Sequence, residues 1–140
     1  MKIGILTCEK LPELTPEDQL LLPKLAKHNI TAIATIWDDK SIQWSDFDYL
    51  IFRNTWDYFE KETTFNTWLH HIEQLGVKTL NSIDIIKNNK HKFYLREMEK
   101  QGITILPTVF LEKTNHLHLA EIVPTPVSYT HLTLPTIYSV

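Results

Sequence analysis

The chain has 140 residues, of which 43% are hydrophobic and 22% charged, with a formal net charge of −3. This composition is typical of a globular domain with a sizeable core. The weakly acidic balance argues against a nucleic-acid-binding protein, and the longest apolar runs are far shorter than the ~20 residues that span a membrane. The single cysteine, Cys8, excludes an internal disulfide and, without a signal-peptide pattern, predicts a cytoplasmic protein.

Segments of strand and helix character alternate as far as residue 80. Apolar, β-branched runs predict strands at residues 2–7, 30–37, 49–52 and 77–80. Apolar residues at helical spacing predict a helix over 15–27, which Pro23 should kink or split, and one over 60–75, which Gly76 should end. A turn or helical turn is expected at 41–46, with Trp44 packing back. The alternation predicts an α/β fold with a parallel sheet.

The pattern changes after Asn81. Short helices are predicted at 82–88 and 90–101, followed by an extended segment at 103–112 in which Pro107 marks an edge strand or a bulge. These elements do not complete the first sheet. We therefore predict a first domain over 1–81 and the beginning of a second over 82–126.

The last residues have a different composition. Residues 122–140 contain no Asp, Glu, Lys or Arg, whereas disordered tails are usually charged. Residues 127–136 resemble the in-frame translation of a transposon end used in sequencing-library preparation. We expect 127–140 to be a non-native, sequencing-adapter-like tail, with the natural gene continuing after Pro126.

The segment Arg53–Tyr58 (RNTWDY) combines polar chemistry with a favourable position. It follows the predicted strand 49–52, and ligands of open α/β sheets bind at the carboxyl ends of the strands. Arg53 offers a planar fork for a carboxylate or phosphate, and Asp57 can accept a hydrogen bond from an amine. The alternative is that Arg53 and Asp57 pair with each other, with the aromatic residues in the core and Thr55 or Asp57 capping a helix.

The familiar nucleotide-binding motifs are absent, since three glycines cannot build a phosphate-binding loop. The seven histidines show no metal-ligand spacing, and Cys8 is expected to be a structural thiol. Lys92 is a candidate for a phosphate contact, although on chemistry alone a solvated lysine in a cluster with Lys87 and Lys90 is favoured.

Several short segments of the sequence resemble those of a known family. The most specific is Arg53–Tyr58, and the supporting ones are Ile5–Glu9, Leu14–Gln19, Ile36–Asp39, Asn81 and Asn89–Leu95. With them, residues 1–112 resemble ATP-grasp ligases. Within these, the sequence is similar to the prokaryotic glutathione-synthetase-like branch, close to D-cycloserine synthetase-type and RimK-like proteins.

The resemblance implies a Rossmann-like pre-ATP-grasp domain followed by the truncated start of an ATP-grasp domain. Such enzymes use ATP and Mg²⁺ to form an acyl phosphate, which an amine attacks to give an amide-type bond. Carried over, Lys92 would bind ATP, and Arg53, Thr55, Asp57 and Tyr58 would bind an amino-acid-like small-molecule substrate.

In that family the Mg²⁺ ligands and a second ATP-binding lysine lie beyond the residues present here. The 140 residues alone should therefore be inactive, and the resemblance leaves room for an oligomeric full-length protein. A non-catalytic α/β module that binds a small anion remains the alternative.

Overall fold

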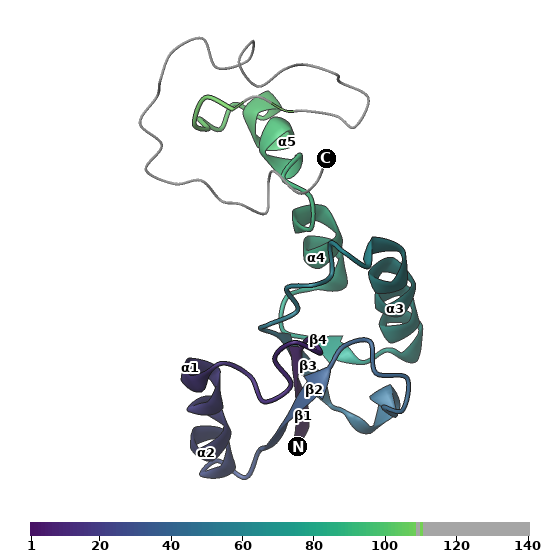
Figure 1. Cartoon of the computed structure of the whole chain (residues 1–140). Helices are drawn as coiled ribbons and strands as arrows, with labels where there is room; N and C mark the ends of the chain where they lie inside the picture. The colour runs from purple at the N-terminus through teal and green to yellow at the C-terminus, as the bar shows by residue number, and fades with distance from the viewer. Residues whose placement is uncertain (109, 111–140) are drawn as a thin grey trace. The chain divides into compact units, whose positions relative to one another are not determined.

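Four parallel strands form the sheet in the part of the chain that the computed structural model describes, residues 1–108 and residue 110. They are β1 (Lys2–Thr7), β2 (Thr31–Ile36), β3 (Tyr49–Phe52) and β4 (Lys78–Thr79). Their order in the sheet is β2-β1-β3-β4 (Figure 1). The helical elements are α1 (Pro16–Gln19), α2 (Leu21–Ala26), the 3₁₀ helix η1 (Trp44–Asp46), α3 (Glu62–Leu75), α4 (Ile83–Asn89) and α5 (Tyr94–Lys100). The chain divides into two compact units, Met1–Lys90 and one that begins at His91.

Strand β1 is the buried centre of the sheet. Its residue Ile5 is paired with Ala34 of β2 on one side and with Ile51 of β3 on the other. Successive side chains of a strand point to opposite faces, so Leu6 joins the core cluster on one face while Ile5 is buried on the other. Parallel strands that are covered on both faces have continuous apolar sequences, which explains why the strand at residues 2–7 could be predicted from the sequence.

Helix α3 covers one face of the sheet, and α1 and α2 lie on the other side (Figure 1). The buried face of α3 consists of apolar residues at spacings of three and four: Phe65, Trp68, Leu69 and Ile72. Gly76 ends the helix with a left-handed backbone, φ 67°, as predicted.

The aromatic part of this core lies between α3 and the end of β2. Trp37, which is fully buried, packs edge-on against Phe65 and Trp68, with ring centroids 5.1 and 5.8 Å apart. Trp44 packs back against Trp68, as predicted, and Cys8 is a buried member of the same cluster.

The helix predicted over 15–27 is split, as its sequence indicated. Thr15 caps α1 by accepting a hydrogen bond from the Asp18 N–H, and Pro16 occupies the first turn. Pro23 has no N–H to donate to the carbonyl four residues earlier, and its ring crowds that carbonyl. The break at Leu20 follows from this.

The helices predicted at 82–88 and 90–101 are both found: α4 lies in the first unit, and α5, in the second, is shorter than predicted. Residues 103–108 form no strand, so the edge strand predicted at 103–112 is not found in the described part of this segment. The remainder of it and the tail at 127–140 lie outside the described residues. The predicted domain boundary at residue 81 stays a prediction. No helix in the described part is long and apolar enough to cross a membrane.

Two leucines of α3 provide a test of the core. Leu69 is fully buried, whereas Leu75 on the same helix is 40% exposed. We expect Leu69→Ala to lower the free energy of unfolding by about 2–5 kcal/mol, because it removes buried contacts and leaves a cavity. Leu75→Ala, the same chemical change, should cost much less. Urea unfolding of the 140-residue chain, followed by circular dichroism, measures both; equal losses would contradict this packing.

Candidate functional site

The carboxyl edge of the sheet brings two polar loops together. Strand β1 is followed by helices on one face, and its neighbour β3 is followed by a helix on the other face. The strand order therefore reverses between β1 and β3, and open α/β sheets bind ligands in the crevice at such a switch point. Residues 8–15 leave β1 there, and residues 53–61 leave β3. The backbone N–H groups of Arg53 and Asn54 both donate to the Leu6 carbonyl, at 3.2 and 3.0 Å.

The first polar cluster joins the loop after β3 to helix α1 through Arg53 and Asp18. Arg53 donates from Nε and Nη2 to Oδ1 of Asp18, at 2.9 and 2.6 Å. The Asp18 side chain is 5% exposed and that of Arg53 is 48% exposed. The hydrogen bonds from Arg53 hold the pKa of Asp18 below its ordinary value, although burial opposes them, and the same contact raises the pKa of Arg53. Both groups therefore stay charged at neutral pH.

Asn54 is a further buried residue of this cluster. The residue is only 3% exposed, and its side chain helps to hold the pKa of Asp18 below its ordinary value. Within the described residues its buried Oδ1 atom has no hydrogen-bond partner. A buried unpaired acceptor is costly, and such groups in a folded protein call for an explanation such as a functional role or a bound water.

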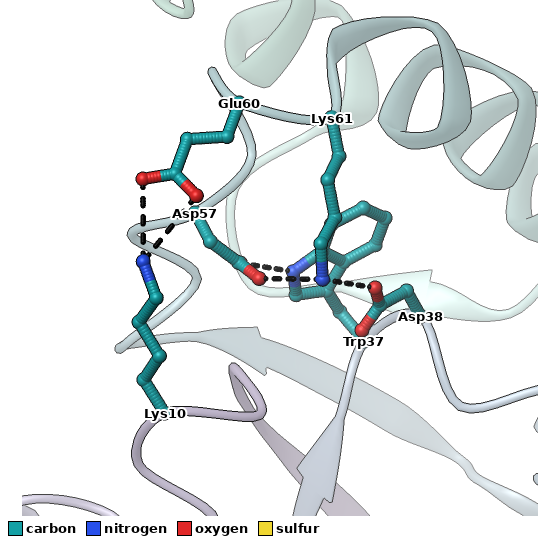
Figure 2. A network of polar contacts seen from close by, with 6 residues as sticks. All are labelled: Lys10, Trp37, Asp38, Asp57, Glu60 and Lys61. Atoms are coloured by element: carbon teal, nitrogen blue, oxygen red, sulfur yellow. Dashed lines mark hydrogen bonds and ion pairs between the residues drawn. The ribbon is translucent and has the colours of Figure 1, made fainter.

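The second cluster surrounds Asp57, which is 5% exposed (Figure 2). The indole Nε1 of Trp37 donates to Asp57 Oδ1 at 2.7 Å. The ammonium of Lys61 lies 2.9 Å from Asp57 Oδ2 and 2.6 Å from Asp38 Oδ2. Beside them Lys10 reaches Glu60 at 3.3 Å, in a more exposed pair that also links the two loops.

The electrostatics of this cluster favour the charged forms. Burial is the largest single influence on Asp57 and raises its pKa, but the hydrogen bonds from Trp37 and Lys61 together outweigh it, so that the pKa lies below its ordinary value. Hydrogen bonds to Asp38 and then to Asp57 raise the pKa of Lys61. The carboxylate of Asp57 is therefore ionised and fully engaged within the protein.

The remaining predicted residues of the loop have distinct surroundings. Tyr58 packs its ring 5.2 Å from that of Phe65 and donates its hydroxyl to the Lys90 carbonyl at 3.0 Å; burial raises its pKa. Thr55 is half-buried. Trp56, in contrast, is 58% exposed. Hence the alternative, an Arg53–Asp57 pair, does not form: Arg53 is bound to Asp18, and Asp57 to Trp37 and Lys61. Of the two aromatic residues, Tyr58 packs against the core and Trp56 does not.

Lys92 lies in the second unit. It is exposed and lies two residues before the start of α5, and its ammonium lies 5.7 Å from the centroid of the Tyr94 ring. Arg53–Tyr58, in contrast, belongs to the first unit.

Asp18, Trp37 and Lys61 are the contributors that the sequence did not indicate. Asp18 had a local signal, but for another role: it is an acid in the first turn of a helix that Thr15 caps. Trp37 ends a predicted strand, and Lys61 lies four residues after Asp57, a spacing that allows an ion pair.

An open hollow of 590 Å³ lies at the opposite, amino edge of the sheet, beside Met1, Asp48 and Lys78. Ligands of α/β sheets bind at the carboxyl edge, and the buried charged groups converge there. The candidate site is therefore placed at the carboxyl edge.

Comparisons with known proteins agree with this fold. A family model described as the N-terminal domain of the D-cycloserine synthetase DcsG matches residues 3–81. The chain belongs to this family. It is 24% identical over 79 residues to the cycloserine biosynthesis protein DcsG of Streptomyces lavendulae, a match that covers 56% of this chain and 26% of that protein. This chain thus spans about a quarter of the length of that relative.

The fold is also similar to the crystal structure of D-cycloserine synthetase DcsG. The TM-score is 0.68 at 20% sequence identity, and the match covers 76% of this chain and 36% of that chain. The predicted Rossmann-like α/β fold with a parallel sheet is confirmed, and so is the resemblance to D-cycloserine synthetase-type proteins at the level of the N-terminal domain.

Asp57→Asn tests whether the second cluster holds the loop. The change keeps the size of the side chain but removes the charge that faces Lys61, so we expect it to lower the free energy of unfolding by about 1–3 kcal/mol. Glu60→Gln, the matched change in the exposed pair of the same loop, should have a much smaller effect. Thermal and urea unfolding compare the two; a loss as large for Glu60→Gln would contradict the assignment.

The decrease of the unfolding free energy in acid tests the carboxylates of both clusters. Asp18 and Asp57 have pKa values below their ordinary ones, so the unfolded chain binds more protons than the folded chain in acid. Their contribution is complete above the unfolded pKa, at about 4, and is lost as the pH falls through the folded pKa values. Unfolding free energies measured between pH 7 and pH 3 should fall in acid, and less steeply for Asp57→Asn. An unchanged slope in that variant would overturn the assignment.

Proposed function

We propose that the full-length protein is an ATP-dependent ligase of the ATP-grasp type that forms a carbon–nitrogen, amide-type bond through an acyl phosphate. The observation that carries the proposal is the match of residues 3–81 to the N-terminal domain of a D-cycloserine synthetase. The switch point at the carboxyl edge, with its fixed polar loop, supports a binding role for this domain.

In this proposal the first domain binds the amino-acid-like acceptor. Arg53 is the group best suited to a contact with substrate, since its guanidinium is half-exposed at the crevice. Thr55 is half-buried beside it in the chain. Asp57 and Tyr58 have partners inside the protein, so their part is to hold the loop that presents the other two.

ATP and Mg²⁺ are the expected cofactors. Lys92 is exposed and suits a phosphate oxygen as a compact point charge. ATP supplies the phosphoryl group that activates the carboxylate to be joined. The described residues contain no group of three His, Cys, Asp or Glu side chains that could hold a metal ion, so no step that depends on Mg²⁺ is assigned to them. We propose that the 140-residue chain is by itself inactive and that the cytoplasmic full-length protein supplies the rest of the catalytic site.

Release of ADP by the full-length protein, with amino acids and hydroxyurea-like compounds as substrates, tests this function. Lys92→Ala should weaken ATP binding about tenfold or more, because it removes a charged contact to phosphate. Lys100→Ala, which removes an exposed lysine paired with Glu97 in the same unit, is the control and should bind ATP normally. ATP affinity unchanged by Lys92→Ala would remove Lys92 from the site. Anion binding without ADP release would instead favour the binding module.

A further inference from the structure

The Arg53–Asp18 pair is built differently from an ordinary surface ion pair. Surface pairs join two solvated groups and contribute little. Here the carboxylate is buried at 5% exposure, while the guanidinium that it holds is 48% exposed. Taking a carboxylate out of water is costly unless its partners are well placed. The buried member therefore needs Arg53, and the exposed member retains access to solvent.

The geometry leaves part of the guanidinium unused. Nε and Nη2 both point to a single oxygen, Oδ1 of Asp18, at 2.9 and 2.6 Å. No partner of Nη1 is found among the residues that the structure describes. A guanidinium presents five N–H donors in a rigid fork, so a contact with one edge fixes the direction of the donors that remain.

Asp18 itself cannot act as a ligand for substrate. Its carboxylate is bound by Arg53, the side chains of Asn54 and Thr15 also help to lower its pKa, and the residue is 3% exposed. Thr15 and Asp18 belong to the segment that follows β1, whereas Arg53 and Asn54 follow β3. Asp18 thus fixes Arg53 across the switch point, where ligands of such sheets bind.

We infer that Asp18 is a positioning residue that orients Arg53 so that its remaining N–H groups bind the α-carboxylate of the acceptor amino acid. This inference rests on the proposed function and assigns the anionic end of that substrate to one residue.

The charges of the two clusters favour a carboxylate over a phosphate. Asp18 neutralises Arg53, and Lys61 faces two carboxylates, Asp38 and Asp57. Lys10 is paired with Glu60. The cationic side chains of these clusters are thus all paired with carboxylates, so the clusters offer little net attraction for a dianion. A zwitterion, with one carboxylate for the planar fork and one ammonium group, suits such a balance.

The test measures discrimination between acid and amide by the full-length protein. Isothermal titration calorimetry with D- and L-serine and D- and L-alanine, each beside its carboxamide, gives the ratio of the two affinities. We expect at least one acid to bind roughly tenfold to a hundredfold more tightly than its amide, because the amide cannot accept charge-assisted hydrogen bonds from the fork. Asp18→Asn and Arg53→Lys should each bring that ratio close to one.

Arg53→Lys and two further variants separate positioning from a structural role. Arg53→Lys keeps the charge that a merely structural ion pair requires but loses the fork. Lys10→Gln breaks the exposed pair that links the same two loops, and should leave the ratio unchanged. If Asp18→Asn does not fold, Asp18→Glu retains the charge but shifts it by one methylene, and should also lower the ratio.

The outcomes distinguish this inference from the proposed function. Wild-type protein that binds no acid more tightly than its amide, or variants that keep the wild-type ratio, would overturn the inference even if ADP is released with amino acids. If the ratio of acid to amide affinity depends on Asp18 and Arg53 but the protein releases no ADP, the inference is supported and the proposed ligase function is overturned.

Discussion

The buried carboxylate of Asp57 sets the shape of the carboxyl edge. An ionised group at 5% exposure is stable only if the protein replaces the water that it has lost. Here the replacements come from two other elements: the indole of Trp37, directly after β2, and the ammonium of Lys61, directly before α3. The end of β2, the loop after β3 and the start of α3 must therefore keep fixed distances. Lys61 extends the same constraint to Asp38.

A loop held in this way determines which of its side chains face solvent. Asn54 and Asp57 are buried, whereas Arg53 and Trp56 are exposed. Asp57 holds the loop through Trp37 and Lys61, and the backbone N–H of Asn54 donates to the Leu6 carbonyl. The outward residues are therefore presented without a large loss of conformational entropy when a ligand binds. Within residues 53–58, the buried residues thus hold the loop in place, and the exposed residues are available to contact a ligand. Preorganisation of this kind is what a binding loop on an α/β scaffold requires.

Much of this architecture follows from local sequence patterns, but the partners in the site do not. The strands 2–7 and 49–52 and the end of α3 at Gly76 follow from apolar runs and a glycine stop, which depend only on neighbouring residues. The partner of Arg53 is 35 residues away, and only the order β2-β1-β3-β4 brings Asp18 to it. Residues 103–108 form no strand although their apolar run predicted one, because a strand needs a neighbour to pair with and none of the described residues pairs with them.

The pKa shifts indicate what this domain contributes to a reaction. A general acid or base works best when its pKa lies near the working pH, which requires an acid with a raised pKa or a lysine with a lowered one. In the two clusters every shift runs the other way: the pKa values of Asp18 and Asp57 are lowered and those of Arg53 and Lys61 are raised. These four groups keep their charges through the neutral range, so they suit holding and orienting a charged molecule rather than exchanging protons with it. In the proposed ligase, groups outside the two clusters then carry out proton transfer, and the first domain binds and orients the acceptor.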